Sequence, residues 1–221
     1  MNKQKTIDTL IAWLAEKIPA GGGILVPVSG GSDSALSFWL SAQKLKAQTK
    51  AVYIGENLRN KEWFDMLGAV SLDTVDFGKN NPEVGRWAYF LTLCLEENRV
   101  LVGSRNRTEM YLGTFSNASR VSALLPLAGL WKSEVMELCK YVGVPEDIII
   151  SSNRADPECG RPETMADISH DVVDRFLQTK LGLPVGEGLC EPTEAQRAYL
   201  ETVYMQNRHK AQLPFIGPEA I

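Results

Sequence analysis

The sequence predicts an α/β protein with a doubly wound, mostly parallel sheet flanked by helices. Short apolar runs alternate with segments of helical periodicity through the first half of the chain, and this alternation is typical of parallel strands joined by crossover helices. A glycine- and serine-rich turn at residues 29–34 lies directly between the first apolar run and a helical segment. Such sheets bind ligands beyond the carboxyl ends of their strands, so the site is expected at the loops after Val28, Ile54 and Val102.

The expected strands are short. The first, at residues 24–28, is a continuous apolar run, which is typical of a strand buried on both faces. Three further strands are expected at residues 51–54, 71–77 and 100–102.

The expected helices follow from apolar residues spaced three and four apart. The first helix has such residues at Ile7, Leu10, Ile11, Leu14 and Ile18, and residues 19–23 end it. The last helix begins at a capping box of Thr193 and Gln196 and runs to about Asn207. The other helices are expected at residues 35–47, 62–70, 86–96, 108–115, 131–142 and 168–181, with a loop at 145–162 and a linker at 183–192.

The composition excludes several classes of protein. The net charge of −4 does not favour a nucleic-acid-binding protein. The four cysteines are widely spaced and form no CxxC pair, so a zinc site or a disulfide framework is not expected; Cys94 and Cys139 fit apolar helix faces. The N-terminal segment lacks the apolar region of a signal peptide, and no apolar run is long enough to span a membrane. We therefore expect a cytoplasmic protein.

The turn at residues 29–34, with the sequence SGGSDS, has the layout of a phosphate-binding loop. Glycines let backbone N–H groups approach an anion closely, and the N-terminus of the following helix adds partial positive charge. The loop is not a Walker A motif, because no Gly-Lys-Ser/Thr follows at the required spacing. The plainer alternative is a Ser/Gly turn that only caps a helix. The complete string between a strand and a helix favours phosphate binding.

SGGSDS resembles the pyrophosphate loop of the N-type ATP pyrophosphatases, which cleave ATP between the α and β phosphates. Later segments resemble the NAD synthetase family in the same order along nearly the whole chain. They are VGSRNRTE at 102–109, LPLAGLWK at 125–132, GVPE at 143–146 and RHKAQLP at 208–214. The resemblance implies an adenine nucleotide alpha hydrolase-like fold over a single domain, residues 1–221. In it, residues 183–221 would form a C-terminal helix and tail that close the site.

The resemblance also implies roles for individual residues. ATP would be bound by Ser29, Gly30, Gly31, Ser32, Asp33, Ser34, Ser104 and Lys132, and Mg²⁺ by Asp33 and Glu109. The second substrate or the chemical step would involve Arg86, Arg154, His209 and Lys210. Four of these residues have a plainer alternative. Glu109 and Lys132 could be ordinary surface charges, and His209 and Lys210 could be cations that complement a helix C-terminus.

The implied activity is that of an AMP-forming amide ligase, with ATP and Mg²⁺ as cofactors. It would adenylate the carboxylate of deamido-NAD and amidate it with ammonia. The partners would be these small molecules and a second copy of the chain, with the helices around Trp63 and Trp87 at the dimer interface. Neither a nucleic acid nor a membrane is expected as a partner.

The sequence departs from the family pattern mainly on the side of the acid substrate. A Gly-Asp-Gly loop of the family is replaced by residues 119–123, which contain Arg120 and neither an acid nor a glycine. Residues 55–60 and 153–156 also differ, and an Arg-x-Arg pair is reduced to Arg86. Two alternatives therefore stay open: a pyrophosphate-loop enzyme that adenylates a different acid or carbonyl, and a non-catalytic nucleotide-binding homologue.

Overall fold

Strand β1 (Gly23–Pro27) lies inside a four-stranded parallel sheet of order β3-β2-β1-β4. The computed structural model describes residues 1–78, 81–152, 165 and 167–211. Its other strands are β2 (Thr49–Ile54), β3 (Val70–Asp73) and β4 (Arg99–Leu101), and Leu25 of β1 pairs with Lys50 on one side and Leu101 on the other. The predicted α/β class with a parallel sheet is confirmed.

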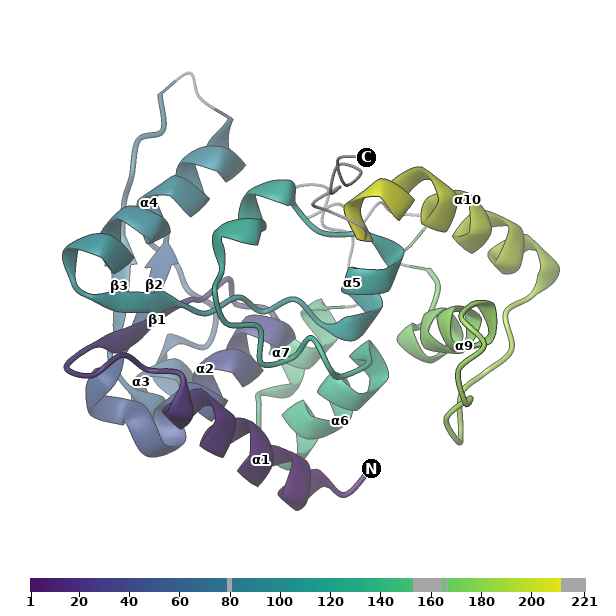
Figure 1. Ribbon diagram of the computed structural model, residues 1–221, viewed down its shortest axis with the longest axis horizontal. Helices are drawn as coiled ribbons and strands as arrows, with labels where there is room; N and C mark the ends of the chain where they lie inside the picture. Colours follow the sequence, from purple (N-terminus) through teal and green to yellow (C-terminus); the bar gives the residue numbers. More distant parts are fainter. Residues whose placement is uncertain (79–80, 153–164, 166, 212–221) are drawn as a thin grey trace, which may run out of the picture.

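Helices cover both faces of this sheet (Figure 1). Ile24 and Val26 of β1 belong to the largest apolar core, with α1 and α2, whereas Leu25 belongs to a smaller core with Phe90 of α4. This alternation follows from the opposite directions of successive side chains on a strand. The helices on the α2 face are α1 (Lys3–Glu16), α2 (Ser32–Leu45), α3 (Lys61–Leu67), α6 (Lys132–Tyr141) and α7 (Glu146–Ser151), and α4 (Pro82–Glu96) covers the other face.

A third apolar core lies beside the sheet. It is built by α5 (Arg107–Leu112), α9 (His170–Lys180) and α10 (Glu194–Ala211), with Trp131 at the border to α6. In Figure 1, α9 and α10 lie together at the side of the molecule away from the strands. Short 3₁₀ turns, η1 (Lys46–Gln48) and η2 (Asn117–Val121), complete the described elements. None of the helices in the described part of the chain is both long and apolar enough to cross a membrane.

Several predicted boundaries differ from the structure. The loop expected at residues 145–162 is wrong over α7, because Ile148 and Ile149 bury their side chains in the main core and fold that stretch as a helix. The third strand ends at Asp73 instead of residue 77, and Val102 forms only an isolated bridge with Leu124. The capping box of Thr193 and Gln196 is confirmed. Helix α10 continues four residues beyond Asn207 and ends at Ala211.

Gly113 fixes the close approach between α5 and α10. Its φ is +73°, a conformation that strains other residues, and a Cβ built there would lie 2.5 Å from Cβ of Asn207 and 2.7 Å from its carbonyl oxygen. Gly143 has a similar φ of +77°, but a Cβ there would meet nothing within 4 Å. A side chain at either glycine would strain the backbone, but only a side chain at Gly113 would also overlap with neighbouring atoms.

We expect Gly113→Ala to lower the free energy of unfolding by about 2–5 kcal/mol, because backbone strain and steric overlap with α10 add together. Gly143→Ala, the matched control, should cost only about 1–2 kcal/mol from backbone strain. Urea unfolding followed by circular dichroism measures both. Equal losses in the two variants would contradict the tight packing of α5 on α10.

Candidate active site

A cavity of about 430 Å³ opens where the carboxyl ends of β1, β2 and β4 meet. Its walls come from the loop at 29–34, from the segment after β2, from residues 104–114 and from the end of α7. As expected from the topology, the loops after Val28, Ile54 and Val102 all contribute. The cavity therefore lies where a parallel sheet binds its ligands.

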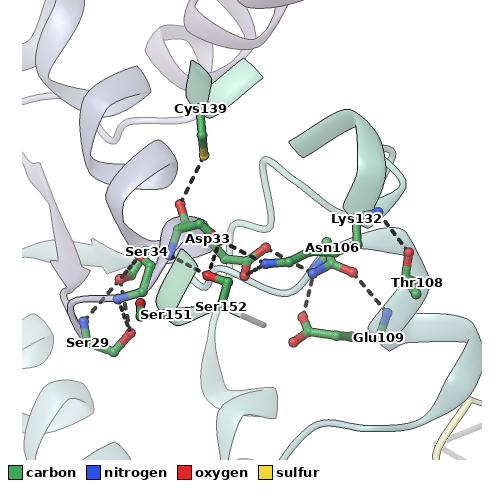
Figure 2. A network of polar contacts seen from close by, with 12 residues as sticks. Ser29, Asp33, Ser34, Asn106, Thr108, Glu109, Lys132, Cys139, Ser151 and Ser152 are labelled. Carbon is green, nitrogen blue, oxygen red and sulfur yellow. Dashed lines mark hydrogen bonds and ion pairs between the residues drawn. The ribbon is translucent and has the colours of Figure 1, made fainter. Parts of the chain in front are cut away.

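The 29–34 loop is held in shape by its own hydroxyl groups (Figure 2). The Ser29 N–H donates to Oγ of Ser34 at 3.1 Å, and that hydroxyl donates to the carbonyl oxygen of Gly31 at 3.0 Å. Gly30 has a φ of +80°, which turns the chain sharply before α2. Gly31 is the N-cap of α2 and provides no side-chain cap. The helix N-terminus at the cavity wall is consequently suited to an anion.

Asp33 and Lys132 meet at the floor of the cavity. Lys132 is only 6% exposed; its Nζ forms an ion pair with Asp33 and donates to Oγ of Ser32 at 2.9 Å. Asn106 donates from Nδ2 to Oδ1 of Asp33 at 2.9 Å. Residues from α2, α5 and α6 thus converge on one carboxylate, as Figure 2 shows.

Glu109 lies beside this group and closes a capping box with Asn106. Its Oε2 accepts from the Asn106 N–H at 3.1 Å, and Oδ1 of Asn106 accepts from the Glu109 N–H at 3.0 Å. Burial, followed by the negative charge of Asp33, raises the pKa of Glu109 to about 7, against the opposing effect of Lys132. A cation near both carboxylates would favour the ionised form of Glu109.

The pair of Asp33 and Glu109 fits the chemistry of a Mg²⁺ site. Mg²⁺ prefers oxygen ligands and is usually held by one or two carboxylates together with substrate phosphates and water. Within the described residues, no group of three or more His, Cys, Asp or Glu side chains is placed to hold a metal ion. Two acidic side chains beside the 29–34 loop match the donor set that Mg²⁺ takes in proteins.

The position of Lys132 depends on how the N-terminus of α6 is capped. The Lys132 N–H donates to Oγ1 of Thr108, and the Ser133 N–H donates to Oδ2 of Asp174, both at 2.8 Å. Thr108 also donates its hydroxyl to Asp174, which is fully buried. Burial raises the pKa of Asp174, and its hydrogen bonds with Ser133 and Thr108 act in the opposite direction. Side chains of α5 and α9 therefore cap the helix that carries the lysine.

Most of the residues predicted to bind ATP or metal come together here, and their roles stay predictions. The cavity is lined by Ser29, Gly30, Gly31, Asp33, Ser34, Ser104, Glu109 and Lys132. Ser32 is buried next to Lys132.

The residues predicted for the second substrate are placed differently. Arg86 lies on α4, and His209 and Lys210 lie in the last turn of α10; none of the three is among the described residues that line the cavity. The Lys210 ammonium donates to the carbonyl oxygen of Phe115 at 3.1 Å. Arg154 lies outside the described residues.

The sequence analysis missed several residues of the cavity. Asn106 could have been found, because an Asn followed by a Glu three positions later is a capping-box signal. Ser152 gave no local signal; its hydroxyl accepts from the Ser32 N–H at 3.2 Å and donates to Oγ of Ser32 at 2.6 Å, although 120 positions separate the two. Tyr53 of β2, Asn57 and Arg59 of the segment after it, and His170 and Val173 of α9 also line the cavity, and none of them was predicted to bind a substrate.

Comparison with known proteins agrees with this geometry. A family model described as NAD synthase matches residues 74–214, more than half of the chain. The NH(3)-dependent NAD(+) synthetase of Thermococcus kodakarensis is 25% identical over 99% of this chain and 98% of that protein. The enzyme of the same name from Pyrococcus horikoshii is also 25% identical, over 99% of this chain and 95% of its own length.

Solved structures share the fold. The NH3-dependent NAD synthetase of Campylobacter jejuni, solved with a nitrate ion, superimposes with a TM-score of 0.72 at 20% identity, covering 99% of this chain and all of the other. The NMN synthetase of Francisella tularensis gives a TM-score of 0.72 at 21% identity, with both chains fully covered.

We expect Asp174→Ala to lower the free energy of unfolding by about 2–4 kcal/mol, because the Thr108 hydroxyl and the Ser133 N–H would be buried without their acceptor. Urea unfolding measures the loss. Asp167→Ala removes an exposed carboxylate just before α9 and serves as control. A change in the Asp174 variant within about 0.5 kcal/mol of wild type would contradict the capping role.

Proposed function

The chain belongs to the NAD synthase family, and we propose that it is an AMP-forming amide ligase that converts deamido-NAD to NAD with ATP and ammonia. The observation that carries the proposal is the convergence of Asp33, Glu109 and Lys132 on the phosphate-binding loop in one cavity. A protein that only bound a nucleotide would not need two carboxylates and a buried lysine at this point. Family membership likewise favours deamido-NAD over an unrelated acid.

In this proposal the reaction has two displacements. A carboxylate oxygen of deamido-NAD attacks the α-phosphorus of ATP, and pyrophosphate leaves. Ammonia then attacks the acyl carbon of the adenylate, AMP leaves with the electrons of the C–O bond, and the nitrogen releases one proton to water. Both steps develop or move charge on phosphate oxygens, so fixed positive groups lower their barriers.

The protein's own residues supply those groups. The 29–34 loop and the N-terminus of α2 would hold the β and γ phosphates through backbone N–H groups. Lys132, held at Asp33 and Ser32, would neutralise a phosphate oxygen. A Mg²⁺ ion, held by Asp33 and Glu109, would supply further neutralisation of the phosphates when bound. With ammonia as the nucleophile, catalysis is mainly positioning and electrostatic stabilisation.

We also propose that the protein acts as a cytoplasmic homodimer. Helix α4 supports the dimer, because Val84 is 56% exposed and Leu95 is 77% exposed on it, and Val121 of the neighbouring η2 is 39% exposed. Trp87 of the same helix packs edge-on against Phe90 and is only partly buried. Exposed apolar side chains that gather on one face favour burial against a partner. Trp63, the other aromatic residue predicted at the interface, packs partly against the main core.

Incubation with ATP, Mg²⁺, ammonia and deamido-NAD should yield AMP, pyrophosphate and NAD in equal amounts, measured by liquid chromatography. Stoichiometric AMP formation distinguishes the ligase from an ATP hydrolase that forms ADP. Omission of Mg²⁺ should abolish turnover. ATP binding without release of AMP or pyrophosphate, under conditions in which the protein is folded, would refute the proposed function and favour a non-catalytic nucleotide-binding homologue.

Lys132→Met should lower kcat/KM by about a hundredfold or more, since a charge that stabilises the leaving group is lost in a buried site. The matched control is Lys140→Met, which removes the same charge from an exposed position on α6 and should leave turnover near the wild-type value. Equal kcat/KM values for the two variants would contradict the proposed role of Lys132.

Light scattering at micromolar concentration should give the mass of a dimer for wild type and of a monomer for Leu95→Glu, because a buried charge on α4 opposes association. Met205→Glu, which places the same charge at an exposed apolar position on α10, should remain dimeric. A monomeric wild-type protein would contradict the proposed dimer.

A further inference from the structure

Two arginines share one aromatic ring beside the cavity. The Cζ atoms of Arg105 and Arg120 lie 4.8 Å and 5.1 Å from the ring centroid of Phe115. Arg105, directly after the cavity-lining Ser104, is only 8% exposed, and Phe115 is also buried. We call Arg105 and Arg120 the arginine pair. Like charges repel, so two guanidinium groups on one buried ring are costly without an anion.

Arg105 has no acceptor among the residues that the structure describes. It donates no hydrogen bond and forms no ion pair there, and its Nε is buried without a partner. A buried cation normally binds a carboxylate, because an unpaired charge that has lost its water is unfavourable. The stacking contact with Phe115 offsets only part of this cost. The side chain thus has unused donors.

The charges around Arg105 also indicate that its guanidinium lacks a compensating anion. Its pKa is lowered by burial first and by the nearby charge of Arg120 second, and only Glu109 opposes these effects. Glu109 is already engaged in the capping box with Asn106. The neighbouring Ser122 also has a buried Oγ without a partner in the described residues, and a Cβ on Gly103 would lie 2.7 Å from it. Segments 103–105 and 115–122 are therefore adjacent and hold unsatisfied polar groups.

Two of the three guanidinium nitrogens of Arg120 donate hydrogen bonds. Its Nη2 donates to the carbonyl oxygen of Lys210 and its Nε to Oδ1 of Asn117 at 3.4 Å. These contacts hold the side chain in place over Phe115, and Nη1 has no acceptor within the described ranges. A planar guanidinium that is already oriented loses little entropy when it binds a phosphate.

The arginine pair lies beside one wall of the cavity. Ser104 and Asn106, on either side of Arg105 in sequence, line the cavity, and so does Thr114, the neighbour of Phe115. We propose that Arg105 and Arg120 bind a phosphate group of the nicotinate nucleotide whose carboxylate is adenylated in the cavity. This inference rests on the proposed function.

The test varies the protein and the substrate together. Arg105→Gln and Arg120→Gln are assayed at saturating ATP, Mg²⁺ and ammonia with two phosphorylated acids: deamido-NAD, which carries a diphosphate, and nicotinate mononucleotide, which carries one phosphate. KM for the phosphorylated acid that the wild type uses should rise about tenfold or more, the usual loss for a hydrogen bond to a charged group. KM for ATP should stay unchanged. The acid that shows the larger effect identifies the source of the phosphate.

Nicotinate riboside, the same acid without phosphate, supplies the decisive comparison. As a competitive inhibitor against the nucleotide, it should have the same inhibition constant for wild type and for both variants. An inhibition constant that rises as much as the nucleotide KM, or a nucleotide KM that does not change, would overturn the inference. Arg197→Gln removes an equal charge from an exposed position on α10 and should behave as wild type.

Two further measurements keep the outcomes separate. Thermal unfolding of each variant identifies damage to the fold; if Arg105→Gln does not fold, the partly exposed Arg120 carries the test alone. If the wild-type protein turns over neither acid, the proposed function fails. Calorimetric titration of wild type and Arg120→Gln with nicotinate mononucleotide and with deamido-NAD then tests the arginine pair by itself, and equal affinities in the two proteins overturn it.

Discussion

The capping of one helix end places Lys132 in the cavity. Helix α6 lacks a side-chain cap of its own at Trp131, and its first N–H groups are satisfied instead by Thr108 and Asp174. These acceptors belong to α5 and α9, so the start of α6, which packs on the sheet side, is held by the core that α5, α9 and α10 form. This junction fixes the start of the helix that carries Lys132, whose ammonium forms an ion pair with Asp33.

Local patterns were enough to predict the part of the site that is contiguous in sequence. The 29–34 loop was predictable because its hydroxyl groups form hydrogen bonds with residues only a few positions away. The sheet was likewise predictable, since its strands are apolar runs separated by helical segments. Lys132 and Glu109 were predicted only through the longer segments that resemble the family. No periodicity within the chain distinguishes them from surface charges.

The rest of the site depends on contacts between distant segments. Ser152 lies in a stretch with the polar composition of a loop, yet the burial of Ile148 and Ile149 turns the residues before it into α7 and brings its hydroxyl to Ser32. Asp174 is acidic, and an isolated amphipathic helix would place it as readily in solvent as against α6. The positions of Ser152 and Asp174 follow from burial between segments that are distant in sequence, and the local composition carries no information on such burial.

The cap on α6 also has a consequence for the order in which the protein forms. Ser133 and its acceptor Asp174 are 41 positions apart, whereas all four strands of the sheet precede both of them. During synthesis the sheet and α2 can therefore pair before α9 has left the ribosome, while the Ser133 N–H of α6 is still without its acceptor. The nascent chain would acquire a folded sheet first, and the cap of α6 would be complete only once the C-terminal third is made.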